Sequence, residues 1–185
     1  MTRNPSRSIP VPADAAADTG VSTMNSPHVP VNDFLYFEDA EVGDTCWTPS
    51  FTVTGEVIDT YARVSGDHNP VHVDEEYAKG SHFGSRVGHG LLGLAIADGL
   101  KSQSEYRFHP GYSLGWSVTF VAPIAIDDTV RLKFWVEILR ASGSRPGWGI
   151  VILPCELVNQ DGVVVMRGEH QLMVPRRPGS SQEQT

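Results

Sequence analysis

Cysteine is scarce in this chain of 185 residues, and its two copies, Cys46 and Cys155, lie far apart. Neither belongs to a CxxC pair or to a Cys/His pattern with metal-ligand spacing, so the sequence predicts neither a disulfide framework nor a zinc site. Low cysteine usage of this kind fits a reducing compartment, and we expect a cytoplasmic protein. No metal or redox cofactor is indicated.

Long apolar runs and an excess of basic residues are also missing. The longest apolar stretch, residues 91–97, is short and broken by glycine, which argues against a membrane span. Fourteen basic and twenty-two acidic side chains give a net charge of −8. This balance disfavours nonspecific binding to nucleic acid or to anionic membrane surfaces. Since there is also no internal repeat, we expect one soluble domain.

The ends of the chain differ from its middle in composition. Residues 1–31 are rich in Pro, Ser, Ala and Asp without a sustained apolar period, and they predict a disordered N-terminal tail. Asp14 and Asp18 argue against a transit peptide. Residues 176–185 are predicted to form a flexible C-terminal tail. The folded domain is therefore expected to span residues 32–175.

Hydrophobic periodicity predicts an α+β fold. Thr54 is positioned to cap a helix over residues 55–64, and Asp74 to cap a second, short helix. The segment from His89 to about Lys101 is apolar nearly all round, which is typical of a buried central helix. Asp161-Gly162 is a hairpin signal, and Pro49 indicates an edge or a bulge in the first strand. Strands of an antiparallel sheet are expected at residues 45–54, 113–121, 129–139, 149–159 and 163–174.

The segment Ser65–Asp74 carries the clearest chemical signal. It sets Asp67 and His72 five residues apart on a loop that turn-forming residues would hold rigid, and such loops often display catalytic side chains. A carboxylate and an imidazole can divide acid and base work. Taken singly, Asp67 fits a turn residue and His72 a core histidine. Because Gly90 then opens the long helix with unpaired backbone donors, the combination favours an enzyme site.

These residues resemble the signature of the MaoC-like hydratases and dehydratases, the R-specific enoyl-CoA hydratase group. The resemblance covers roughly residues 37–174. It implies a hotdog fold, in which an antiparallel sheet wraps a long central helix, and a homodimer with each active site near the subunit interface. The matching positions are Tyr61, the loop Ser65–Asp74, Ala78, Phe83, Val87, His89, Gly90, and the segments Phe37–Asp44 and Phe120–Val130.

The resemblance also implies a reaction and the residues that perform it. Hydration of a 2-enoyl thioester needs a base for water, an acid for the α-carbon and donors for the developing enolate oxygen. In the resembled family the matching aspartate and histidine form the catalytic dyad, so we assign Asp67 and His72 to it, acting through a bound water. The matching helix start places the oxyanion donor at the backbone N–H of Gly90. The expected product is an (R)-3-hydroxyacyl thioester of CoA or of an acyl-carrier protein, formed without a cofactor.

Three further residues have alternative supporting roles. Asn69 and Ser65 either orient the water and the loop or make local turn hydrogen bonds. His89 either contacts the substrate or packs the helix start. Asp74 is assigned to helix capping rather than to catalysis.

Asp98 departs from the family pattern, because better-known members carry a small hydroxyl residue there that helps to hold the water. It either pairs with Lys101 at a solvated helix end or faces the site. In the second case it would alter substrate choice, raise the pKa of a neighbouring group, or serve as the helix carboxylate of a hotdog acyl-CoA thioesterase. A noncatalytic acyl-binding subunit is the remaining alternative. Candidates for contacting the anionic CoA are Lys79, Arg86, Arg107, Arg140 and Arg145.

Overall fold

The computed structural model describes residues 34–180, so the predicted tail over residues 1–31 lies outside the described residues. Within 34–180, no helix combines the length and the hydropathy that a membrane crossing requires. The elements, in chain order, are a 3-10 helix at Phe37–Asp39, β1 at Thr45–Val53, α1 at Gly55–Ser65, α2 at Pro70–Val73, α3 at Glu75–Gly80, α4 at Gly90–Ser102, β2 at Tyr112–Phe120, β3 at Asp128–Trp135, β4 at Ile138–Ala141, β5 at Trp148–Val158 and β6 at Val164–Pro175.

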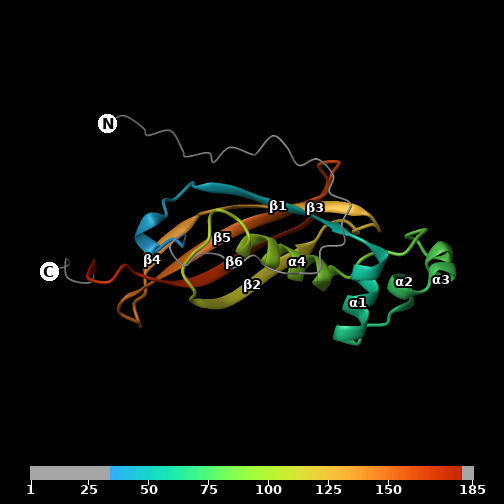
Figure 1. The fold of residues 1–185 in the computed structure, drawn as a ribbon, viewed down its shortest axis with the longest axis horizontal. Coiled ribbons are helices and arrows are strands. Elements are labelled where there is room, and N and C mark those ends of the chain that lie inside the picture. The colour runs from blue at the N-terminus through green and yellow to red at the C-terminus, as the bar shows by residue number, and fades with distance from the viewer. Residues whose placement is uncertain (1–33, 181–185) are drawn as a thin grey trace.

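The strands form one antiparallel sheet in the order β1-β3-β5-β6-β2, with β4 pairing with β5 beyond the end of β3. Figure 1 shows this sheet curving past α4, while α1, α2 and α3 gather at one end of the molecule. The expected α+β hotdog arrangement, a helix against an antiparallel sheet, is confirmed. Gly162, at a φ of 78°, makes the predicted hairpin turn between β5 and β6.

The central helix α4 buries only one of its faces. Leu92, Ile96 and Leu100 recur at helical spacing and belong to the core cluster with residues of the sheet. On the opposite face, 59% of Leu91 is exposed to solvent. The prediction of a helix buried all round was therefore wrong within one chain, because the sheet covers α4 from one side.

Pro49 lies in β1, an edge strand, where the pairing with β3 shifts between Trp47 and Ser50. The predicted bulge at an edge is thus confirmed, since proline cannot donate to the ladder. The predicted single strand over 129–139 was wrong: it divides into β3 and β4. Val136 lies in the break, and its backbone bonds to Gly43 and Asp44, before β1.

Residues 176–180 continue from β6 and bond to the 3-10 helix. Glu38 accepts hydrogen bonds from Arg176 Nε at 2.7 Å, from the Arg177 backbone at 2.9 Å and from Ser180 Oγ at 3.0 Å. These bonds lower the pKa of Glu38 to about 2, against the opposing effect of its partial burial. The end of β6 is in this way attached to the segment that precedes β1.

Candidate active site

The segment that carries Asp67 begins at the end of α1. Thr54 caps that helix by accepting a hydrogen bond from the Val57 N–H, and Gly66 ends it in the left-handed conformation at a φ of 78°. Ser65 Oγ donates to Tyr61 O at 2.7 Å and accepts from Asp67 N at 3.2 Å. Ser65 therefore has the local turn role, and it fixes the backbone from which the Asp67 side chain extends.

His72 lies on the short helix α2, so the prediction of an irregular loop was wrong for residues 70–73. Asn69 caps α2 by accepting from Val71 N at 3.3 Å, and Pro70 occupies the first turn. Asp67 Oδ1 in turn accepts from Asn69 N at 3.2 Å. Asn69 thus has the turn role as well, and successive side-chain caps set the position of His72 relative to Asp67.

The His72 ring is anchored to the backbone on one side. Its Nδ1 lies 2.8 Å from Val87 O. Because a carbonyl oxygen only accepts, Nδ1 must carry the proton, and Nε2 of the neutral ring then holds a lone pair. Arg86 supports this position, since its Nε donates to His72 O at 2.6 Å and its Nη2 pairs with Asp59 on α1. The imidazole is held with its basic nitrogen directed away from Val87.

His89 is the buried member of the cluster and contacts both predicted catalytic residues. Its Nε2 donates to Asp67 O at 2.9 Å, and its ring stacks on the His72 ring with the centroids 3.8 Å apart. Only 2% of the residue is exposed. Burial is the largest cause of the lowered pKa of His89, and the bond to Asp67 O opposes it. His89 is therefore a buried ring that joins the helix start to Asp67, as one of its two predicted roles requires.

The fold brings one side-chain atom each of Asp67, His72 and His89 within 4.8 Å of one another. Two imidazoles and a carboxylate are ligand types that Zn²⁺ accepts. However, one nitrogen of each imidazole is already engaged by a backbone carbonyl oxygen, His72 Nδ1 by Val87 O and His89 Nε2 by Asp67 O. Asp67 is exposed and His72 half-buried. The geometry suits a water molecule that donates to the carboxylate and to an imidazole.

Gly90 begins α4 directly after His89, which is the N-cap residue. The first N–H groups of a helix have no intrahelical acceptor, so they are available to an anionic oxygen. A Cβ at Gly90 would lie 2.9 Å from the Phe120 ring. The space beside this glycine is therefore taken by β2, and close packing against Phe120 is the direct reason for glycine here. From the sequence alone, we expected glycine here to allow the close approach of a ligand.

Asp98 lies at the other end of α4, where 57% of its side chain is exposed and Oδ1 is 3.0 Å from Lys101 Nζ. It forms the ion pair that was one of its two predicted alternatives. Of the candidate CoA contacts, Lys79 pairs with Glu75 and Glu76, and Arg145 lies over the Tyr112 ring. The Arg86 side chain is only 15% exposed and is bound to Asp59, and its contact with CoA stays a prediction.

The positioning roles of Arg86 and Val87 were not predicted from the sequence. Val87 N donates to Val71 O at 3.2 Å, and Gly88 N donates to Ile124 O at 2.8 Å. These bonds fasten α2 to the segment before α4 and that segment to the turn before β3. The sequence offered a weak signal for them, the irregular glycine-punctuated stretch between Gly80 and Gly90, which does not reveal its partners.

Comparisons with known proteins identify the family of the chain. Residues 38–145 match the model of the MaoC like domain. The chain is 32% identical to 3-hydroxybutyryl-CoA dehydratase of Methylorubrum extorquens, over 77% of this chain and 86% of the relative. It is 31% identical to (R)-specific enoyl-CoA hydratase of Rhodospirillum rubrum, over 77% and 93%.

Among solved structures, the MaoC-like dehydratase from Rhodospirillum rubrum superposes with a TM-score of 0.70 at 30% identity. The superposition covers 78% of this chain and 99% of that one. The family model matches more than half of the chain, and the relatives are matched along most of their length. The solved structure shares the hotdog architecture. The chain belongs to the MaoC-like family.

Proposed function

We propose that this protein is a hydro-lyase that reversibly adds water across the double bond of a 2-enoyl-CoA, giving an (R)-3-hydroxyacyl-CoA. One observation carries the proposal: the Asp67 carboxylate and the His72 imidazole lie together beside the start of α4, with His72 Nε2 directed away from its backbone anchor. The activities named for the relatives, hydration and dehydration of CoA thioesters, support the same reaction class.

Asp67 and His72 divide the proton transfers. A water bound between them donates one hydrogen bond to each, and one member takes a proton as the oxygen bonds to the β-carbon. The same proton equivalent then returns to the α-carbon, so that water is added and the dyad is regenerated. The chain itself supplies the acid, the base and the oxyanion donors, and the proposal invokes no cofactor.

The backbone N–H of Gly90 stabilises the thioester oxygen as charge develops on it. Preorganised donors at a helix N-terminus suit this role, because they need no reorganisation during the reaction. His89 connects the two halves of the site, since it precedes Gly90 in the chain and bonds to Asp67 O. The oxyanion donor and the dyad are thus fixed relative to each other by one buried ring.

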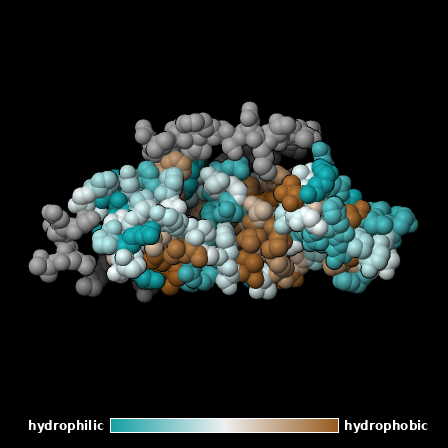
Figure 2. Space-filling view, turned by 90° about the horizontal axis from the view of Figure 1, so that it is seen from below, coloured by the Kyte–Doolittle hydropathy of each residue, from teal (hydrophilic) through white to brown (hydrophobic). Residues whose placement is uncertain are grey.

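We also propose that two copies of the chain pair through β2 and the open face of α4. β2 is an edge strand, and Leu114 and Phe120 on it are each 48% exposed. Figure 2 shows a hydrophobic patch near the middle of the face on which α4 and β2 lie. An apolar edge strand is a template for strand pairing, and a two-fold dimer would cover it together with Leu91.

The thioesterase alternative has less support. It requires Asp98 to act on the substrate, yet this carboxylate is engaged by Lys101 and points to solvent. It also does not explain why Asp67 and His72 are held close together.

Incubation of the purified protein with crotonyl-CoA tests the proposal. We expect the conjugated enoyl absorbance to decrease without release of free thiol, and chiral analysis to give the (R)-3-hydroxy product. Release of thiol would instead identify a hydrolase. No change in either signal, with a correctly folded protein, would support the noncatalytic alternative.

A further inference from the structure

A second polar cluster lies at the C-terminal end of α4, away from Asp67 and His72. Lys101, in the last turn of α4, is only 13% exposed at its side chain. Its Nζ contacts His170 Nδ1 on β6 and Asp98 Oδ1, and lies 4.8 Å from the centre of the Trp116 ring on β2. His170 stacks on Trp116 at 4.0 Å. The largely buried Lys101 side chain thus contacts residues of two strands, β6 and β2.

The hydrogen bonds fix where protons are available in this cluster. His170 is 2% exposed, and burial together with the charge of Lys101 lowers its pKa to about 4. A neutral His170 accepts from Lys101 at Nδ1, so its proton lies on Nε2, 2.8 Å from Ser113 Oγ. Ser113 Oγ accepts the hydrogen bond from His170 Nε2–H, so its own O–H can donate to another acceptor. Asp98 and His170 each accept a hydrogen bond from the Lys101 ammonium group. The third N–H of that group can therefore donate to another acceptor.

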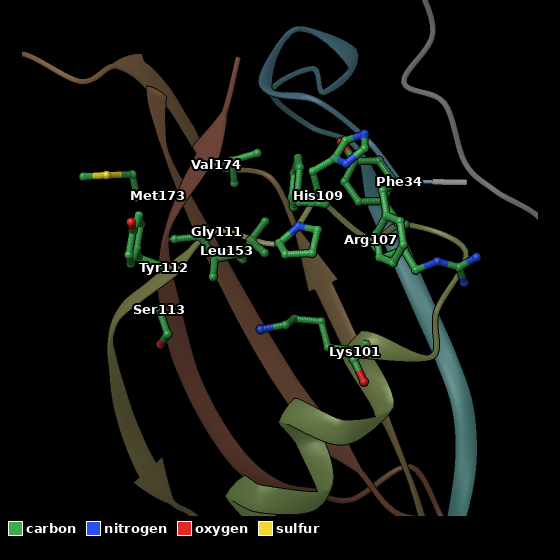
Figure 3. A pocket seen from close by; sticks show the side chains of 15 residues that line it. Phe34, Lys101, Arg107, His109, Gly111, Tyr112, Ser113, Leu153, Met173 and Val174 are labelled. Atoms are coloured by element: carbon green, nitrogen blue, oxygen red, sulfur yellow. The ribbon is translucent and has the colours of Figure 1, made fainter. Parts of the chain in front are cut away.

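Both remaining donors border a cavity of about 180 Å³. Figure 3 shows Lys101 reaching from the end of α4 toward Ser113 on β2, with Leu153 and Val174 also bordering the space. Further apolar lining comes from Phe108 and Leu172. A space with apolar walls and two hydrogen-bond donors complements a carbon chain that ends in a strong acceptor.

We propose that this cavity receives the distal end of the acyl group and that this end carries a carboxylate, so that the substrate is a thioester of a dicarboxylic acid. The inference rests on the proposed function, since it names the substrate class of the same enzyme. A carboxylate accepts from both the ammonium of Lys101 and the hydroxyl of Ser113, and bonds of this charged kind are the strong ones. Its charge also offsets the cost of burying Lys101, the main cause of that lysine's lowered pKa.

Pairs of 2-enoyl-CoA thioesters of equal chain length, one ending in a methyl group and one in a carboxylate, provide the test. For the wild type we expect kcat/KM to favour the carboxylate at the best length. Lys101→Met, which keeps the stem and removes the charge, should lower that preference about 10- to 100-fold. Turnover of the methyl-ended thioester should persist. Lys79→Met is the matched control, since Lys79 is exposed on α3.

The outcomes separate this inference from the function on which it rests. Hydration of the methyl-ended thioester with an unchanged preference in Lys101→Met overturns the carboxylate site and leaves the hydratase intact. If no thioester is hydrated by the wild type, both proposals fail. Should Lys101→Met lose both activities, Ser113→Ala decides: a lowered carboxylate preference supports the site, and an unchanged preference overturns it.

Discussion

The two ends of α4 are built by different means. At its N-terminal end, Asp67, Asn69 and His72 are positioned by bonds between near neighbours in the sequence and remain largely open to solvent. At its C-terminal end, Lys101 and His170 meet across 69 positions of sequence and are buried. The open end suits proton transfer with water, whereas the buried end suits recognition of a group that must be desolvated. One helix thus joins a chemical site to a specificity site.

Replacing a member of the dyad should have the largest effect. We expect Asp67→Asn and His72→Gln each to lower kcat for crotonyl-CoA hydration by about 10²- to 10⁴-fold, because each removes an acid or base. The amide introduced by Asp67→Asn keeps an oxygen that can accept from the Asn69 backbone, so the melting temperature should stay close to that of the wild type. Asp74→Asn is the matched control, since it keeps the α3 cap and should preserve activity.

Gly90→Ala should have the next largest effect. A methyl group at Gly90 meets the Phe120 ring, so either the ring or the start of α4 must move, and the oxyanion donor moves with the helix. Loss of one such donor lowers kcat by about 10²- to 10³-fold. Gly99→Ala on the same helix is the control, because no atom lies within 4 Å of its added Cβ. Equal kcat values for the two variants would contradict the role of the Gly90 N–H as the oxyanion donor.

The buried end should make stability depend on pH. The pKa of His170 in the folded protein lies below its ordinary value of 6.5, at about 4. The contribution of neutral His170 to the free energy of unfolding is therefore complete above pH 6.5. It is lost as the pH falls through 4, and the loss reaches about 3 kcal/mol. Urea unfolding of wild type and His170→Gln at several pH values measures this, and their difference in unfolding free energy should shrink toward acid pH. A constant difference would contradict the burial of a neutral histidine.

Asp98→Asn should have the smallest effect on hydration. It tests whether this residue, near the C-terminal end of α4, takes part in the reaction. Because Asp98 is mostly exposed, removing its charge should change crotonyl-CoA hydration by less than about fivefold. The thioesterase alternative predicts a loss of thiol release instead. Parallel assays of enoyl absorbance and free thiol distinguish the two.

The sequence predicted the open end well and the buried end poorly, for the same physical reason. The caps of Thr54 and Asp74 act over three residues and were predicted from local order. The cap of Asn69 was not predicted, because the helix α2 that it begins was expected to be a loop. The stack of His72 on His89 was not predicted, although both residues had been singled out. It depends on Val87 O, a backbone group that carries no sequence signal.

The cluster of Lys101, His170 and Ser113 depends on the register of β6 with β2, in which Trp116 lies opposite His170. Hydrophobic alternation predicts that these strands exist but does not determine which residues face each other. The central helix illustrates the same limit: its apolar composition indicated complete burial, whereas the sheet covers one face only. Local motifs could be predicted from the sequence, whereas the pairing of residues across the sheet could not.

The most direct test of the central claim is a double-mutant cycle of Asp67→Asn and His72→Gln, followed by hydration of crotonyl-CoA. If the two side chains act on one shared water, the double variant should be no slower than the slower single variant, because either change disables the same step. Losses that multiply in the double variant would contradict the shared water and would mean that the two residues act independently.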